Sequence, residues 1–263
     1  MRFSANLGFL WRDRPLPDAV RAAARAGFDA VECHWPYATP AADLAAALAE
    51  TRLPLLGMNT APGGKGQFGL SALPGHATEA RAAIDQALDY AVAVGCGAVH
   101  VMAGFAEGPG AEAAFRAALE HACTRAAPLG ITILIEPLNT RDAPGYFLTT
   151  TEQALALIGA LARPNLKLMF DCYHVQIMEG DLTRRLQRLL PHIGHVQIAG
   201  VPDRGPPDEG ELSYVHLLGV LEAAGWTRPI GAEYRPGDTT ENAAENATEA
   251  SLGWLHRWQQ RRG

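Results

Sequence analysis

Short apolar runs alternate with longer amphipathic segments along all 263 residues of the chain. The runs are rich in aliphatic residues, which is typical of buried strands. We expect eight strands, over residues 3–9, 30–33, 55–59, 98–102, 132–136, 167–171, 195–199 and 230–233. The segments between them are alanine-rich and repeat their apolar residues at helical spacing. We expect helices over residues 17–26, 40–51, 75–94, 110–127, 150–162, 181–190, 213–224 and 240–261.

This alternation of strands and helices predicts a parallel sheet, because a helix supplies the crossover that parallel strands need. Eight such units in 263 residues favour one α/β domain over 1–263, a closed (β/α)8 TIM barrel. Closure is favoured over an open sheet because it leaves no exposed edge strand. The longest irregular stretches, 59–74 and 200–212, both follow strands. We therefore expect both loops on the catalytic face of the barrel.

The composition argues against several classes of partner. A formal net charge of −6 disfavours nucleic-acid binding through a basic surface. The apolar stretches are too short for a membrane span, and the N-terminal one is too short for a signal peptide. The cysteines form no CxxC pair, which disfavours a thiolate zinc site or a redox motif. We therefore expect a reduced, cytoplasmic protein without nucleic-acid or membrane partners.

Four polar residues stand at the carboxyl ends of four successive expected strands. Glu136 follows ITILI, Asp171 follows LKLMF, Gln197 lies in HVQIAG and Glu233 lies in PIGAEYRP. The carboxyl ends of barrel strands meet on one face, which is where the active sites of TIM barrels lie. A buried carboxylate is unfavourable unless it is paired or holds a metal. The pattern therefore predicts one shared site.

Each carboxylate taken alone also has an ordinary structural explanation. Glu136 can form a salt bridge with Arg141 or Lys167, and Asp171 can cap the next turn. Glu233 can pair with Arg235. The recurrence of these residues at the same point of consecutive units favours the shared site instead. Two glutamates, one aspartate and one glutamine form an all-oxygen ligand set, which favours Mg²⁺ or Mn²⁺ over zinc.

The motifs around these residues resemble the hydroxypyruvate isomerase family of xylose-isomerase-like TIM barrels. They are Glu136-Pro-Leu-Asn, Asp171-x-Tyr-His174, Gln197-Ile-Ala-Gly and Glu233-Tyr. Three loop motifs extend the resemblance over nearly the whole chain. The motifs are Val31-Glu32 followed by Trp35-Pro36-Tyr37, the sequence GLSALPG over residues 69–75, and the sequence GELSY over residues 210–214.

The resemblance implies a role for each matched residue. It implies that Glu136, Asp171, Gln197 and Glu233 bind a divalent metal and that the two glutamates act as the acid/base pair. It also implies that His174 contacts the substrate. Sugar epimerases usually carry histidine where Gln197 stands, which favours the isomerase branch. Endonuclease IV, another relative, needs a histidine-rich zinc site that these positions do not supply.

Other polar residues are expected near the same face. His100 is expected to face the site from the fourth strand, and Glu32 to support it from the second. His195 lies two residues before Gln197, so a buried structural role is favoured. Lys65 and Arg204 stand on the two long loops. An anionic substrate needs a cation, and Arg204 is favoured because its guanidinium can bind a carboxylate through two hydrogen bonds.

These features lead to the prediction of a metal-dependent isomerase that interconverts hydroxypyruvate and 2-hydroxy-3-oxopropanoate (tartronate semialdehyde). Two glutamates would transfer a proton through an enediolate. A 2-oxotetronate isomerase and a ketose 3-epimerase are alternatives with the same carbon-acid chemistry. A non-catalytic sugar-acid-binding barrel is the alternative outside enzymes. The expected partner is a small hydroxy-oxo acid or sugar, and a homo-oligomer is left open.

Overall fold

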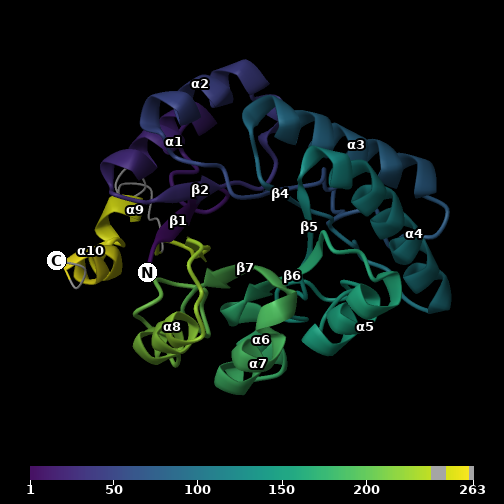
Figure 1. The fold of residues 1–263 in the computed structure, drawn as a ribbon. Helices are drawn as coiled ribbons and strands as arrows, with labels where there is room; N and C mark the ends of the chain where they lie inside the picture. Colours follow the sequence, from purple (N-terminus) through teal and green to yellow (C-terminus); the bar gives the residue numbers. More distant parts are fainter. Residues whose placement is uncertain (238–246, 261–263) are drawn as a thin grey trace.

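The computed structural model describes residues 1–237 and 247–260, and within them eight parallel strands form a barrel surrounded by helices (Figure 1). The strands are β1 (Phe3–Asn6), β2 (Ala30–Glu32), β3 (Met58–Asn59), β4 (Ala98–His100), β5 (Thr132–Ile135), β6 (Leu166–Asp171), β7 (Ile193–Ile198) and β8 (Ile230–Ala232). Their hydrogen-bonded order is β2-β1-β8-β7-β6-β5-β4-β3. The eight predicted strands and the TIM-barrel architecture are therefore confirmed.

The barrel is completed between β2 and β3, where the extended segment before β3 takes the place of a longer strand. Leu56 N donates to Val31 O at 2.8 Å, and Cys33 N donates to Gly57 O at 3.1 Å. These bonds pair the outer edge of β2 with backbone groups. The barrel therefore leaves no exposed strand edge at this point, which was the reason for expecting closure.

The helices follow the strands in the expected alternation. They are α1 (Leu16–Arg25), α2 (Ala41–Thr51), α3 (Ala77–Val94), α4 (Pro109–Ala126), α5 (Thr151–Leu161), α6 (Cys172–Met178), α7 (Leu182–Leu189), α8 (Tyr214–Ala223), α9 (Ala247–Ala250) and α10 (Gly253–Gln260). Single 3₁₀ turns are Pro36–Ala38, Ala127–Leu129 and Leu190–His192.

Three elements differ from the expected ones. The first strand ends at Asn6 rather than at residue 9, because the Asn6 side chain accepts from Gly8 N at 2.9 Å and turns the chain. Helix α6 was not expected, and it begins directly after Asp171. The expected helix over 240–261 lies partly outside the described residues, and the rest forms α9 and α10.

The alternation of side chains along each strand separates two environments. One face packs under the helices in a continuous apolar core that includes Ile133, Ile135 and Phe170. On the other face a small apolar cluster of Ala98, Leu134 and Met169 lies at the same strand parity as the polar positions. Side chains two residues apart in a strand point to the same face. His100, Glu136 and Asp171 each follow one of these apolar residues by two positions, so they lie on that face too. The sequence thus brings polar side chains together at the carboxyl ends of the strands.

Candidate active site

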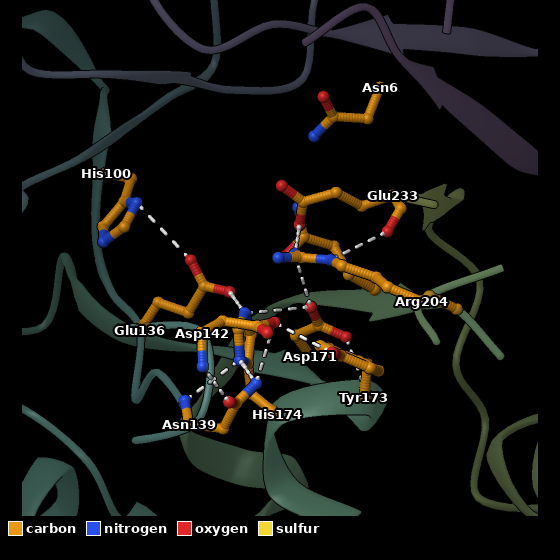
Figure 2. Close-up of polar contacts among 12 residues, drawn as sticks. Asn6, His100, Glu136, Asn139, Asp142, Asp171, Tyr173, His174, Arg204 and Glu233 are labelled. Carbon is orange, nitrogen blue, oxygen red and sulfur yellow. Dashed lines mark hydrogen bonds and ion pairs between the residues drawn. The ribbon is translucent and has the colours of Figure 1, made fainter. Parts of the chain in front are cut away.

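A cleft of about 490 Å³ opens at the carboxyl ends of the strands. Figure 2 shows Glu136, Asp171 and Glu233 pointing into one region, with Arg204 beside Asp171 and Glu233. The polar lining residues are His34, Asn59, His100, Glu136, Asp142, His174, Arg204 and Glu233, and the apolar ones are Phe9, Trp35, Phe68, Met102, Leu138 and Ala143.

Glu136 and Asp171 bring two carboxylates together from adjacent strands. Glu136 follows β5, and Asp171 ends β6. One oxygen of Asp171 accepts from Tyr173 N at 2.9 Å, so Asp171 also caps α6. Its other oxygen faces the site. Ligand atoms of Glu136, Asp171 and His174 lie within 4.8 Å of one another, a spacing compatible with a metal site.

The hydrogen bonds of His174 define its chemical role. Its Nδ1 lies 3.0 Å from Asn139 N and 2.7 Å from Asn139 Nδ2, and both of these groups are donors. Nδ1 therefore accepts, and the neutral ring carries its proton on Nε2. Nε2 lies 3.8 Å from Glu136 Oε1 and 3.7 Å from Asp171 Oδ2. A protonated Nε2 is a hydrogen-bond donor rather than a metal ligand, which fits a substrate contact better than coordination.

Glu233 follows β8, and its two oxygens have different partners. Oε1 lies 2.8 Å from His34 Nε2. Oε2 lies 3.2 Å from an Arg204 nitrogen but has no partner with hydrogen-bond geometry among the described residues. Arg235 donates its backbone N–H to Arg204 O instead. The pairing of Glu233 with Arg235 suggested by the sequence is therefore replaced by contacts with His34 and Arg204.

Arg204 is a buried cation between two carboxylates. The same guanidinium nitrogen lies 3.2 Å from Asp171 Oδ2 and 3.2 Å from Glu233 Oε2. The guanidinium also lies over the rings of Phe9 and Tyr173, at 4.7 and 5.0 Å. Burial alone would lower the pKa of Arg204, but the two carboxylates outweigh it and raise the pKa. Arg204 is therefore always charged, and it partly neutralises the cleft.

Glu136, Asp171 and His100 have pKa values shifted toward their neutral forms. Burial raises the pKa of Glu136 well above its usual value, and the neighbouring Glu233 and Asp171 add to this shift. Burial raises the pKa of Asp171 to about 7 although Arg204 opposes it. Burial lowers the pKa of His100 to about 3, so its imidazole is neutral. The neighbouring carboxylates thus oppose one another's ionisation, and a divalent cation would favour their charged forms.

Several buried polar atoms of the site have no hydrogen-bond partner within the described residues. They are both ring nitrogens of His100 and one oxygen each of Glu136, Gln197 and Glu233. Leaving such atoms unpaired costs about 1–3 kcal/mol each. Oxygen atoms of this kind suit a hard divalent ion. The unpaired oxygens of Glu136, Gln197 and Glu233 therefore have the donor chemistry of the predicted metal site, and the described group with metal-ligand spacing is Glu136, Asp171 and His174.

Glu32 lies deeper in the barrel than the cleft and fixes the orientation of Gln197. Its carboxylate accepts from Gln197 Nε2 at 2.9 Å, from Asn6 Nδ2 at 3.0 Å and from Ser4 Oγ at 3.3 Å, and it also contacts His195 Nε2. Because the amide nitrogen of Gln197 faces Glu32, its oxygen points away from Glu32. Burial would raise the pKa of Glu32, but His195 and these hydrogen bonds lower it.

The other sequence-based candidates lie in different surroundings. His100 lines the cleft, and its Nδ1 is 3.6 Å from Glu136 Oε2. Lys65 is exposed and is not among the described residues that line the cleft. Lys167 donates to Pro191 O at 3.2 Å rather than pairing with Glu136. Arg204 is thus the single Lys or Arg in the described lining of the cleft.

Sequence reasoning missed His34 and Asp142. His34 follows β2, and Asp142 lies in the loop after β5, where its carboxylate accepts from Tyr173 Oη at 2.8 Å. Neither residue belongs to a periodic element, so hydrophobic patterning gave no signal. Trp35 and Phe68 form an aromatic side of the cleft with ring centroids 6.0 Å apart. The motif that contains Trp35 was the available signal for this wall.

Comparison with known proteins identifies relatives over the whole barrel. Residues 20–258 match the family model for the xylose isomerase-like TIM barrel. The 2-oxo-tetronate isomerase of Cupriavidus necator is 44% identical over 260 residues, covering 97% of both chains. The hydroxypyruvate isomerase of Escherichia coli is 36% identical, covering 97% of this chain and 98% of that protein.

Solved structures show the same similarity. An AP endonuclease, family 2, from Brucella melitensis has a TM-score of 0.91 and 40% identity, and the match covers 98% of both chains. The 3-keto-D-glucoside 4-epimerase YcjR from Escherichia coli has a TM-score of 0.80 at 23% identity, covering 97% of this chain and 98% of that one, which shows a shared fold.

No helix in the described parts of the chain is long and apolar enough to cross a membrane.

Proposed function

Because the chain belongs to the xylose isomerase-like TIM barrel family and its relatives include named isomerases of short oxo acids, we propose that it is a metal-dependent isomerase. It interconverts hydroxypyruvate and 2-hydroxy-3-oxopropanoate. The observation that carries this proposal is the cleft lined by Glu136, Glu233 and a single arginine, Arg204, which also contacts Asp171 directly beside it (Figure 2). The four buried free cysteines support a reducing, cytoplasmic setting.

The reaction moves one proton between carbon atoms and one between oxygen atoms. A proton leaves C3 of hydroxypyruvate and is returned at C2, while the C3 hydroxyl loses a proton and the C2 oxygen gains one. Glu136 and Glu233 are the acid/base pair for the carbon protons, since both carboxylates face the same cleft. His174 donates from Nε2 to a substrate oxygen, and the unpaired nitrogens of His100 provide a second polar contact.

A divalent ion, Mg²⁺ or Mn²⁺, would be held by Glu136, Asp171, Gln197 and Glu233, and it would supply Lewis-acid stabilisation of the negative charge that develops on the substrate oxygens. Arg204 would bind the substrate carboxylate. Its position between Asp171 and Glu233 supports this role, because it is the cation nearest the reacting groups. The aromatic wall of Trp35 and Phe68 excludes water from that side of the cleft.

A second candidate substrate is 2-oxotetronate, which extends the carbon chain by one hydroxylated carbon. The named activity of the Cupriavidus necator relative favours it. A ketose 3-epimerase is less favoured, because the epimerase YcjR is similar at a level that supports the fold alone. A DNA-repair nuclease is disfavoured by the net charge of −6 and by a cleft with one described arginine.

The deciding experiment is proton NMR of the metal-loaded enzyme in D₂O with hydroxypyruvate, 2-oxotetronate and a ketose in separate samples. We expect deuterium at C2 or C3 of the oxo acids. It should be accompanied by formation of an aldehyde from hydroxypyruvate and of the 3-oxo isomer from 2-oxotetronate. Faster exchange of the four-carbon acid would identify it as the preferred substrate. Metal binding with neither exchange nor product formation in any sample would contradict the isomerase and support the sugar-acid-binding barrel.

A further inference from the structure

His34 is a cleft residue with no role in the chemistry described above. It lies in the segment after β2, at a distance of 199 residues from Glu233 in the sequence, yet its Nε2 is 2.8 Å from Glu233 Oε1. A carboxylate can only accept, so Nε2 carries a proton in this hydrogen bond. Because the proton occupies Nε2, that nitrogen orients Glu233 and does not itself ligate a metal.

The imidazole of His34 is held in place on several sides. Its ring lies directly against Gly8, where an added Cβ would be 2.3 Å from Nδ1. The ring of Phe9 lies edge-on at 5.4 Å, and that of Trp35 lies at 5.3 Å. The backbone of His34 is fixed as well, because its carbonyl accepts from Asn59 N at 2.8 Å. A ring packed in this way keeps its donor at one position.

The hydrogen bond from His34 distinguishes the two oxygens of Glu233. With Oε1 occupied, Oε2 is left without a hydrogen-bond partner in the described chain and lies on the side of Arg204 and Asp171. Glu136 has no donor of this kind, since its nearest cleft imidazole, His100, is 3.6 Å away. The two glutamates of the proposed acid/base pair are therefore held by different means.

We propose that His34 is a positioning residue that fixes the carboxylate of Glu233 so that Oε2 faces the metal and the substrate. This inference rests on the proposed function for its effect on turnover, but its effect on Glu233 is a property of the protein alone. Residues that orient metal ligands typically contribute about 10- to 100-fold to metal affinity or activity. His34 should contribute at that scale.

The test uses two substitutions that separate packing from hydrogen bonding. His34→Phe keeps a ring against Gly8, Phe9 and Trp35 but removes the donor. His34→Gln keeps an N–H donor that can reach the position of Nε2. His76→Phe is the matched control, because His76 is 43% exposed in its side chain and precedes α3, outside the cleft. Mn²⁺ is titrated into each metal-free protein by calorimetry, and thermal unfolding is recorded in parallel.

We expect His34→Phe to bind Mn²⁺ about 10- to 100-fold more weakly than the parent, while it still unfolds in one cooperative transition, and to lose turnover by a similar factor. His34→Gln should recover most of both losses, and His76→Phe should match the parent. Recovery by glutamine separates an orienting donor from a ring that merely fills space. If His34→Phe does not fold, His34→Met replaces it as the donor-free variant of similar size.

Parental Mn²⁺ affinity and turnover in the donor-free variant would overturn the inference. Equal losses in the donor-free variant and in His34→Gln would also overturn it, because the ring rather than the donor would then matter. Loss of Mn²⁺ affinity in a protein whose parent turns over none of the tested acids would support the inference and contradict the proposed function. The two proposals therefore fail through different measurements.

Discussion

Glu32 and Glu136 are buried carboxylates of one barrel with opposite surroundings. Glu32 contacts four polar side chains, those of Ser4, Asn6, His195 and Gln197, and its pKa is lowered. Glu136 has one oxygen without a hydrogen-bond partner among the described residues, and its pKa is raised well above the usual value. The exposed fractions of the two residues are nearly equal, at 4% and 5%.

Burial therefore does not separate a structural carboxylate from a reactive one in this barrel. The two carboxylates differ instead in the number of hydrogen-bond donors that surround them. Glu32 stabilises the charged form through its neighbours, whereas Glu136 faces two further carboxylates and an open cleft. A buried group without partners lowers stability, so its presence at the cleft is explained by a ligand that binds there.

Removal of the metal should have the largest effect. We expect chelation to abolish turnover and Mg²⁺ or Mn²⁺ to restore it, because the cleft carboxylates need a cation. The metal should also raise the free energy of unfolding, by about 2.7 kcal/mol at one hundred times its dissociation constant. Turnover assays and urea unfolding with and without chelator check both. Full activity in protein shown by elemental analysis to lack divalent metal would refute the dependence.

Replacement of Glu136 or Glu233 by glutamine should have the next largest effect. Each substitution keeps the shape and one ligand oxygen but removes the base. Turnover should fall by about 10²-fold or more, the usual scale of acid/base catalysis. Deuterium incorporation from D₂O measures the same step directly. Near-normal turnover of Glu233→Gln would remove it from the acid/base pair and leave a single-base or hydride-shift mechanism.

Arg204→Ala should weaken binding of an oxo acid more than that of a neutral sugar. A hydrogen bond to a charged group contributes about 1.5–3 kcal/mol, or roughly 10- to 150-fold in affinity. Because Arg204 also contacts Asp171 and Glu233, the metal-free protein should lose stability too. Michaelis constants for both substrate types check the selectivity. Equal changes in the Michaelis constants of both substrate types would mean that another residue binds the substrate carboxylate, and Lys65 would be the next candidate.

Glutamine substitutions at Glu32 and Glu136 should change the stability of the metal-free protein in opposite directions. Glu32→Gln breaks a satisfied network and should cost about 1–3 kcal/mol. Glu136→Gln removes a carboxyl group whose ionisation is opposed by burial, Glu233 and Asp171, so the free energy of unfolding should stay equal or rise. Urea unfolding at pH 7 compares the two variants. A loss of the same size in both would show that the two sites are equivalent.

The contribution of Glu32 should disappear in acid. Its folded-state pKa is below the usual 4.5, so the stabilisation is present above about pH 4.5 and is lost as the pH falls through the folded value. The difference in unfolding free energy between the parent and Glu32→Gln should therefore narrow between pH 5 and pH 3, in urea titrations of metal-free protein. A difference independent of pH would mean that Glu32 acts through packing rather than charge.

The barrel and its polar end could be predicted because strand periodicity has a simple geometric consequence. Once residues 132–136 are read as a buried strand, the parity of the strand places Leu134 and Glu136 on the same face, and the structure has them there. Helix α6 could not be predicted, because Asp171 ends a strand and caps a helix in a single residue, without a loop between them.

The loops supply the part of the site that the sequence could not place. Arg204 was predicted to pair with a substrate from a loop over the site. In the structure it is buried between Asp171 and Glu233, with φ of 56°. His34 is missing from the prediction for the same reason, since no periodicity relates the segment after β2 to the end of β8. Such contacts depend on tertiary packing alone.

The close approach of Gly8 to His34 also has a consequence for the way this sequence can change. Any side chain at position 8 would overlap the imidazole at 2.3 Å. The effects of substitutions at the two positions should therefore be non-additive. Gly8→Ala should be poorly tolerated while His34 is present and much better tolerated after His34→Ala. Evolution of the cleft wall at residue 34 is thus tied to the turn after β1, and a library that varies one position alone would miss the permitted combinations.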